Sequence, residues 1–378
     1  MAEAILITGV TGNVGSHVLY ELLYEFHTQN KQTPIYLVIR KNNGKTGLER
    51  LKYEVFAPEL IPTKIASFYK YYLGNTIQVL EGDISNFEIP ESVGEELIVY
   101  HMAASVNLGK GAKAKQEIAV TNYNNTKQFF EIIKRRTKKL IFVSTAFSRG
   151  DIEGVIQDDY HSETNFKFRN FYEEFKMKIE REVVQLAKDY NFKCVIARPS
   201  VISGRLLDAP KYVTNSYIVF YAIGAFFSKM KSLYKDVGRV RIVLNPEVGL
   251  NIVPVDYVAK AIIRAVYLKE NQLNITHTKN VSIKQLLTIM FNKCGIPGLE
   301  YVTEEPKDKS TIEALFYKTV GGQLASYSVS KNHQFESKLV RKLLSDIKEP
   351  DMTSYFKELY DFAHNINFDN RNINLVTN

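Results

Sequence analysis

The sequence has few cysteines. Its 378 residues include two, Cys194 and Cys294, which are too few for a disulfide framework or a cysteine-based zinc site. This usage suits a reducing compartment, so we expect a cytoplasmic protein that holds no metal. Hydrophobic residues make up 45% of the chain and charged residues 24%. These values are ordinary for globular proteins and exclude a disordered tail, a collagen or a coiled coil.

The sequence also lacks long apolar runs. Its first ten residues, MAEAILITGV, contain no basic region followed by an apolar stretch, so we expect no secretory signal. The longest apolar stretch, Tyr217–Phe227, has 11 residues, whereas a transmembrane helix needs about 20. We therefore expect no membrane span.

No strong excess of one charge is present. The chain has 49 Lys and Arg residues against 41 Asp and Glu residues, a net charge of +8 that is spread along the sequence. Nucleic-acid-binding proteins usually gather their positive charge on one stripe. We expect no nucleic-acid partner, while a mild basic excess suits any anionic ligand, including a phosphorylated cofactor.

Short apolar runs alternate with helical patterns through the first two-thirds of the chain. Strands that are apolar on both faces and separated by helices indicate a parallel sheet built from βαβ units. The runs are Ala4–Gly9, Ile35–Ile39, Ile77–Leu80, Leu97–Met102, Leu140–Val143 and Cys194–Ala197. After residue 280 the patterns are mainly helical. We predict an α/β fold: a Rossmann-type doubly wound parallel sheet in residues 1–204 and about 240–282, with a smaller, mostly helical substrate-binding cap in residues 205–239 and 283–378.

A glycine-rich loop follows the first predicted strand and opens a helix. It has the pattern T-G-x-x-G-x-x-G, in which glycines allow a tight turn and a close approach to pyrophosphate. The helix N-terminus supplies free N–H groups and the positive end of its dipole. We therefore predict a dinucleotide site at Thr8, Gly9, Thr11, Gly12, Asn13, Val14 and Gly15.

The ends of the second and third strands favour a phosphorylated dinucleotide. An NAD site usually has an acid after the second strand, whereas this chain has Arg40, which suits the 2′-phosphate of NADP. Arg50 could add a second charge, and either residue could instead be a solvated surface cation, an alternative that weighs more for Arg50 than for Arg40. Asp83, after the third strand, could accept from the adenine amino group or could cap a turn. We expect NADP(H) as the cofactor.

Three Tyr-x-x-x-Lys motifs occur, and their positions differ. They are Tyr123/Lys127, Tyr172/Lys176 and Tyr327/Lys331. Ligands of open α/β sheets bind at the carboxyl ends of strands, where the fifth predicted strand gives way to Thr145. Tyr172 follows on the next helix, and Lys176 is one turn further along the same face. The other two motifs lie on the helix before that strand and in the late helical segment.

This constellation is typical of proton transfer coupled to hydride transfer. A free tyrosine has a pKa of about 10, and a neighbouring ammonium is expected to lower it. Thr145 can hold the substrate oxygen, Tyr172 can pass the proton, and a nicotinamide would supply the hydride. We predict Thr145, Tyr172 and Lys176 as the catalytic residues.

The chain resembles the extended short-chain dehydrogenase/reductase superfamily over about residues 4–285. The resemblance rests on the glycine loop, Gly82-Asp83-Ile84, His101-Met102-Ala103-Ala104, Asn122, Ser144-Thr145, the Tyr172/Lys176 pair and Arg198-Pro199-Ser200. The stretches IRKNNGKTGLERLK, HMAASVN, VSTAF and LNIVPVDYVAKAI are most similar to the male-sterility-type branch. That branch holds fatty acyl-CoA reductases and thioester reductase domains. Asn13 departs from it, since the branch often has Phe or Tyr there.

The resemblance implies an NADP-dependent reductase of an acyl thioester, carried on CoA or on an acyl or peptidyl carrier protein. It implies Thr145, Tyr172 and Lys176 as a triad, with Arg40 and Arg50 on the NADP phosphate. It further implies cofactor contacts from Ile84, Ala103, Ala104, Asn122, Pro199, Ser200 and Val201. The alternatives are a ketone or hydroxysteroid-type dehydrogenase, a sugar-nucleotide epimerase, and a non-catalytic dinucleotide sensor, which would be expected to have a broken triad.

Overall fold

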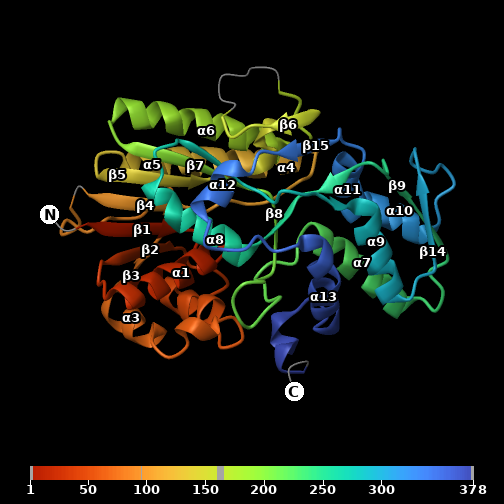
Figure 1. Cartoon of the computed structure of the whole chain (residues 1–378), viewed down its shortest axis with the longest axis horizontal. Helices are drawn as coiled ribbons and strands as arrows, with labels where there is room; N and C mark the ends of the chain where they lie inside the picture. Colours follow the sequence, from red (N-terminus) through yellow and green to blue (C-terminus); the bar gives the residue numbers. More distant parts are fainter. Residues whose placement is uncertain (1–2, 95, 160–165, 376–378) are drawn as a thin grey trace.

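A seven-stranded parallel sheet forms the centre of the structure, a computed structural model that describes residues 3–94, 96–159 and 166–375 (Figure 1). The strand order is β12-β7-β5-β4-β1-β2-β3. The fold is the predicted Rossmann-type α/β fold. The strands are β1 (Ala4–Thr8), β2 (Ile35–Ile39), β3 (Ile77–Glu81), β4 (Leu97–His101), β5 (Thr137–Val143), β7 (Lys193–Pro199) and β12 (Gln272–Ile275).

Helices cover both faces of this sheet, which is why its strands read as continuous apolar runs. Successive side chains of a strand point to opposite faces. Ile5 and Ile7 of β1 join the core formed with α1 (Asn13–Gln29) and α8 (Val255–Arg264). Leu6 joins the opposite core, formed with α5 (Asn125–Ile133) and α6 (Phe171–Asp189).

A third apolar core lies mainly among the helices of the cap, beside the sheet (Figure 1), and also includes Phe147 and Met177. Phe227, Phe291, Phe316 and Tyr360 are all buried in it. The helices are α7 (Phe220–Leu233), α9 (Ile283–Cys294), α10 (Thr311–Lys318), α11 (Val320–Ser328) and α13 (Met352–Asn365).

Two short strands after residue 280 lie outside the mainly helical pattern predicted there. β14 (Gly298–Val302) pairs with β9 (Arg239–Val243), and β15 (His333–Phe335) pairs with β6 (Gly154–Ile156). Both pairs are parallel and join segments that are distant in sequence, so local periodicity gives little sign of them.

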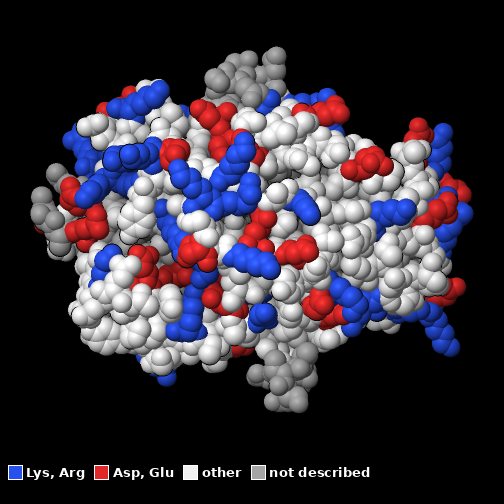
Figure 2. Space-filling model, viewed as in Figure 1, with Lys and Arg blue, Asp and Glu red and all other residues white. Residues whose placement is uncertain are grey.

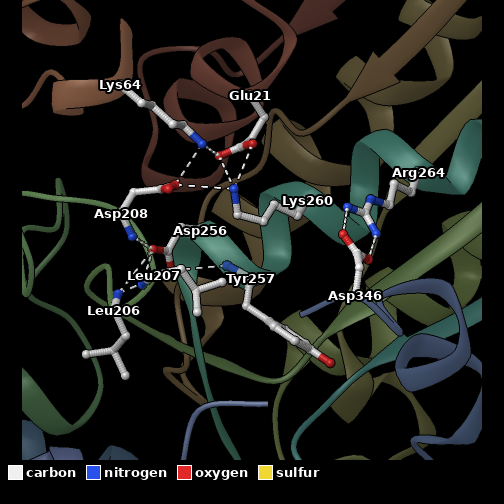
Figure 3. Close-up of polar contacts among 10 residues, drawn as sticks. All are labelled: Glu21, Lys64, Leu206, Leu207, Asp208, Asp256, Tyr257, Lys260, Arg264 and Asp346. Carbon is white, nitrogen blue, oxygen red and sulfur yellow. Dashed lines mark hydrogen bonds and ion pairs between the residues drawn. The ribbon is translucent and has the colours of Figure 1, made fainter. Parts of the chain in front are cut away.

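The chain returns to the sheet domain late, at α12 (Lys338–Leu343). Val340 and Leu344 are buried in the same core as α1 and α8. Arg264 of α8 donates to Asp346, with one N–O distance of 2.8 Å (Figure 3). We therefore propose a cap of residues 205–239 and 283–378 that packs back on the sheet domain at α12.

The loop that begins the cap is fixed by buried polar contacts (Figure 3). It leaves β8 (Val201–Ser203), which pairs with β11 (Ile252–Pro254). The Asp256 carboxylate accepts from the backbone N–H groups of residues 206, 207 and 208 at 2.6–3.3 Å. Lys260 bonds Glu21 at 3.0 Å, and Lys64 bonds Asp208 at 2.9 Å. These alternating charges join the loop to α1 and α8.

The surface shows no single dominant charge on the face in view. Figure 2 shows Lys and Arg interspersed with Asp and Glu over this face. Within the described part of the chain, none of the helices is long and apolar enough to cross a bilayer.

Candidate active site

A cavity of about 470 Å³ lies between strand ends of the sheet and the cap. Its walls come from residues that follow β1, β5 and β7 and from apolar side chains of α7, α9 and α11. The cavity brings together many of the residues predicted from sequence. These are Gly9, Gly12, Asn13, Val14, Gly15, Ala104, Thr145, Tyr172, Lys176, Pro199, Ser200 and Val201.

The glycine loop has the close contacts that a dinucleotide cradle needs. Gly9 has a φ of +74°, and a Cβ there would lie 2.6 Å from the Ala103 nitrogen. A Cβ on Gly15 would lie 2.1 Å from the Gly9 carbonyl oxygen. At Gly12, which lines the cavity, a Cβ would meet only that oxygen, at 3.3 Å. The loop is therefore packed tightly on its inner side and open towards the cavity.

The N-terminus of α1 is also suited to an anion. Gly12 is its N-cap and offers no side chain to bond the first-turn N–H groups, and the first turn contains no acidic residue. The first N–H groups of a helix lack intrahelical partners and lie at the positive end of its dipole. Together with the open side of Gly12, they fit the pyrophosphate of a dinucleotide.

Thr8 and Ala103 set the spacing of two strand ends instead of lining the cavity. Thr8 is buried, and its hydroxyl oxygen accepts from the backbone N–H groups of Met102 and Ala103, each at 3.3 Å. It also bonds Nδ1 of His101 at 2.9 Å. Thr8 thereby ties the end of β1 to the end of β4.

The two arginines predicted for the cofactor phosphate differ in environment. Arg40 is exposed, and its guanidinium lies 3.6 Å from Asp83. Arg50 is buried and donates to the Arg40 carbonyl at 3.0 Å, to the Thr11 hydroxyl at 3.2 Å and to Glu54 at 3.0 Å. Arg50 therefore ties the end of β2 to the glycine loop, while Arg40 presents its charge to solvent.

Asp83, Ile84 and Asn122 are held by contacts within the protein. The Asp83 carboxylate accepts from the Ser85 N–H at 3.1 Å, which is the turn-capping role left open by the sequence. Ile84 packs against the core under α5. Asn122 accepts from the Ser105 N–H at 2.7 Å and donates to the Ser105 carbonyl at 2.8 Å. None of these three residues is among those that line the described cavity.

The predicted triad residues line this one cavity. Thr145 lies two residues after the end of β5 and caps the short turn that follows, accepting from the Phe147 N–H at 3.3 Å. Tyr172 and Lys176 lie in the first two turns of α6, whose N-cap is Asn170. Tyr123 instead bonds Glu182 outside the cavity lining. Of these two Tyr-x-x-x-Lys motifs, the one at Tyr172 therefore contributes to the cavity and the one at Tyr123 does not.

The protonation of the pair differs from the sequence-based expectation. Lys176 is buried, its Nζ donates to the Val143 carbonyl at 2.9 Å, and it lies 5.9 Å from the Tyr172 ring centroid. Burial lowers the pKa of Lys176 to about 8, against a raising effect of Glu180. The expected lowering of the Tyr172 pKa is wrong for this structure, because burial, and then the Glu173 carboxylate, raise it well above its usual value.

The segment after β7 presents a polar atom to the cavity wall. Ser200 is buried, and its hydroxyl has no hydrogen-bond partner among the described residues. Pro199, Ser200 and Val201 all line the cavity. Because a buried hydroxyl without a partner is unfavourable, this position suits a polar group of a bound ligand.

Sequence reasoning missed the polar networks behind the triad. Glu180 and Arg198 form a fully buried ion pair at 2.6 Å, and Glu180 follows Lys176 by one helical turn. That four-residue spacing places Glu180 on the same helix face as Lys176, and it could have been used to predict Glu180 as part of the site. Tyr327, from the third Tyr-x-x-x-Lys motif, also lines the cavity and donates to Glu173 at 2.9 Å. Its place in a late helix gave no such signal.

The fold and this cleft define a dinucleotide-binding protein of the short-chain dehydrogenase/reductase class, an oxidoreductase class. Residues 7–262 match the family described as male sterility protein, an NAD-binding family. The match covers well over half of the chain, so the chain belongs to this family. The resemblance read from its motifs is confirmed, and the cofactor class is a nicotinamide dinucleotide.

Individual proteins show more distant similarity. An alcohol-forming fatty acyl-CoA reductase of Simmondsia chinensis is 27% identical over 168 residues, which is 41% of this chain and 33% of that protein. The match thus spans about a third of the length of this curated relative. The terminal R domain of the myxalamid PKS-NRPS pathway has a TM-score of 0.70 at 20% identity, covering 96% of this chain and 91% of that one.

A UDP-glucuronic acid 4-epimerase from Bacillus cereus, solved with NAD, has a TM-score of 0.61 at 16% identity. That match covers 96% of this chain and 97% of the epimerase chain. At such identities the two solved structures support the fold alone.

Gly15→Ala should disturb the glycine loop, because its Cβ would meet backbone atoms that have no room to move. We expect a loss of about 1–3 kcal/mol in the free energy of unfolding and weaker NADPH binding. Gly74→Ala is the matched control, since Gly74 is also helical, in α3 (Tyr69–Asn75), and a Cβ there meets nothing within 4 Å. Urea unfolding and fluorescence titration measure both effects; equal behaviour of the two variants would contradict the tight packing.

Proposed function

We propose that this chain is an NADPH-dependent reductase of an acyl thioester. The acyl group would be carried on CoA or on an acyl or peptidyl carrier protein, and the product would be an aldehyde or, after a second reduction, an alcohol. The observation that carries the proposal is the cavity itself, in which Thr145, Tyr172 and Lys176 face an apolar wall supplied by the cap.

The cap side of the cavity favours an apolar acyl chain over a sugar nucleotide. Lys176 is the one charged side chain among the described residues that line it. Sugar hydroxyls and phosphates would be desolvated against the apolar wall without partners, which is costly. The wall includes Ile218, Phe220, Ile223, Leu286, Met290 and Leu324. The reductase named among the relatives supports the same substrate class, while a ketone or hydroxysteroid-type dehydrogenase is the alternative that shares this apolar requirement.

The side chains supply proton donation and orientation. When bound, the nicotinamide supplies a hydride to the carbonyl carbon. The Thr145 and Tyr172 hydroxyls donate hydrogen bonds to the carbonyl oxygen, where negative charge develops. The Tyr172 proton passes to that oxygen, and the raised pKa of Tyr172 keeps the phenol protonated at neutral pH. Lys176, fixed on the Val143 carbonyl, holds a positive charge beside the ring.

The second half of the reaction needs no covalent enzyme intermediate. The tetrahedral adduct collapses: its carbon–sulfur bond breaks, its hydroxyl proton passes to the departing sulfur, and the aldehyde carbonyl forms as the thiol leaves. Cys194 lies in β7 and Cys294 in α9; both are buried, and burial raises the pKa of each thiol. Neither lines the cavity. A thiolate nucleophile in this site is therefore unsupported.

NADPH should bind more tightly than NADH, because Arg40 offers an exposed guanidinium at the end of β2. Arg40→Asp should weaken NADPH binding by about 1.5–3 kcal/mol through the loss of a charge-assisted phosphate contact. Lys41→Asp is the matched control, since Lys41 makes the same charge change while paired to Glu81 at 3.1 Å. Fluorescence titrations give all the dissociation constants. If the unaltered protein bound NADH as tightly as NADPH or more tightly, the prediction that NADP(H) is the cofactor would be wrong.

Tyr172→Phe should keep NADPH binding while turnover falls by roughly 100-fold or more, because the proton donor is lost and the ring remains. Tyr123→Phe is the control: it removes a hydroxyl from the same sequence motif, bonded to Glu182 outside the cavity lining. Steady-state rates and NADPH titrations distinguish the two variants. An inactive Tyr123→Phe beside an active Tyr172→Phe would move the site elsewhere.

Thioester reduction should oxidise NADPH and release free thiol in step. We would incubate the protein with NADPH and a panel of acyl-CoA and acyl-carrier thioesters, following NADPH absorbance and a thiol reagent together. The double variant Cys194→Ser with Cys294→Ser should retain the activity. If the thioester panel released no thiol and the protein instead turned over ketones or hydroxysteroids, the proposed thioester substrate would be wrong. The alternative, a ketone or hydroxysteroid-type dehydrogenase, would then be favoured.

A further inference from the structure

One tyrosine of the cap is bonded to the first turn of the helix that carries Tyr172. Tyr327 lies in the last turn of α11, and its ring lines the cavity in a T-shaped contact with Phe147, with 5.5 Å between centroids. Its hydroxyl donates to Glu173 at 2.9 Å and accepts from Asn170 at 2.9 Å. With both bonds made inside the protein, this hydroxyl is not directed at a substrate oxygen.

Both partners of Tyr327 belong to the start of α6, on either side of Tyr172. Asn170 is the helix N-cap: its Oδ1 accepts from the Glu173 N–H at 3.0 Å, while its Nδ2 donates to Tyr327. Glu173 has no exposed surface, and Asn170 is buried. The first turn of α6, which carries Tyr172, is therefore bonded on its cap side to Tyr327.

Arg169 and Asp151 complete the connection. The Arg169 guanidinium pairs with Glu173 at 3.2 Å and lies 5.3 Å from the Tyr327 ring centroid. It also pairs with Asp151 at 3.3 Å, and Asp151 accepts from the backbone N–H of Lys331, just after α11, at 3.1 Å. The end of α11 is thus bonded to the start of α6 at two places.

We infer that Tyr327 is a positioning residue, which bonds the cap to the first turn of α6 and so fixes the orientation of Tyr172 towards the substrate carbonyl. The inference rests on the proposed role of Tyr172 as proton donor. Small misplacements of a reacting group are costly, since about 1 Å can reduce a rate by roughly 100-fold. The third Tyr-x-x-x-Lys motif thereby acquires a role without being a second catalytic pair.

Tyr327→Phe tests this role, because it removes the hydroxyl and keeps the ring that lines the cavity. We expect kcat and kcat/KM to fall together by roughly 10- to 100-fold, with KM unchanged, as for an interaction that matters in the transition state. Tyr301→Phe is the matched control, since it removes another hydroxyl of the cap, one that bonds the Lys284 carbonyl at 3.0 Å outside the cavity lining. A raised KM at unchanged kcat would mean that Tyr327 only contributes to substrate binding, and this result would overturn the inference.

Hydrogen exchange of the protein without substrate gives a readout independent of the reaction. In Tyr327→Phe the peptide of residues 169–176 should exchange faster than in the unaltered protein and in Tyr301→Phe. If Tyr327→Phe proves too unstable in urea, Asn170→Ser replaces it, because serine keeps the capping oxygen and loses the donor to Tyr327. Unchanged exchange in the folded variant would overturn the inference. Faster exchange in a protein that reduces no thioester would uphold the bonded connection while refuting the proposed substrate.

Discussion

The buried ion pair between Glu180 and Arg198 fixes the elements that carry the candidate site. Neither side chain has exposed surface, and the pair is 2.6 Å long. Glu180 also accepts hydrogen bonds from Ser144 and Ser148, on either side of Thr145. Loss of one partner from such a pair leaves an uncompensated buried charge, which typically costs about 3–5 kcal/mol. The pair therefore holds α6, the turn after β5 and the end of β7 in one arrangement, and with them the side chains proposed to donate protons.

Polar contacts join the cap to this arrangement at its first loop. Apolar packing joins the two parts elsewhere: the cap core includes Phe147 and Met177, and Val340 of α12 is buried in the core of α1 and α8. Asp256 fixes the start of the loop, and further along it the Asn215 N–H donates to Asn13 at 3.0 Å. Asn13 belongs to the glycine loop, at a position where the family often has an aromatic residue. An amide there lets the glycine loop and the cap bond directly, at two residues that both line the cavity.

Most of the sheet and the glycine loop could be predicted from sequence, because both depend on short-range patterns. β2 begins and ends where its apolar pattern does, at Ile35 and Ile39. Features made by distant segments could not be predicted in this way. The β9–β14 pairing joins strands more than 50 residues apart, and Tyr327 reaches Glu173 across a separation of 154 residues. Asn122 matched a family motif, yet its side chain holds the Ser105 backbone.

Burial sets the protonation of the site in a way that composition could not indicate. A lysine one turn from a tyrosine suggests a phenolate, yet desolvation disfavours the charged form of each group. In this structure desolvation is the largest effect on both, raising the pKa of Tyr172 and lowering that of Lys176 to about 8. A protonated phenol is what a reductase needs, since its tyrosine must give a proton as the carbonyl is reduced. The enclosed setting of Tyr172 therefore keeps the proton on the phenol until the proposed hydride transfer places negative charge on the carbonyl oxygen.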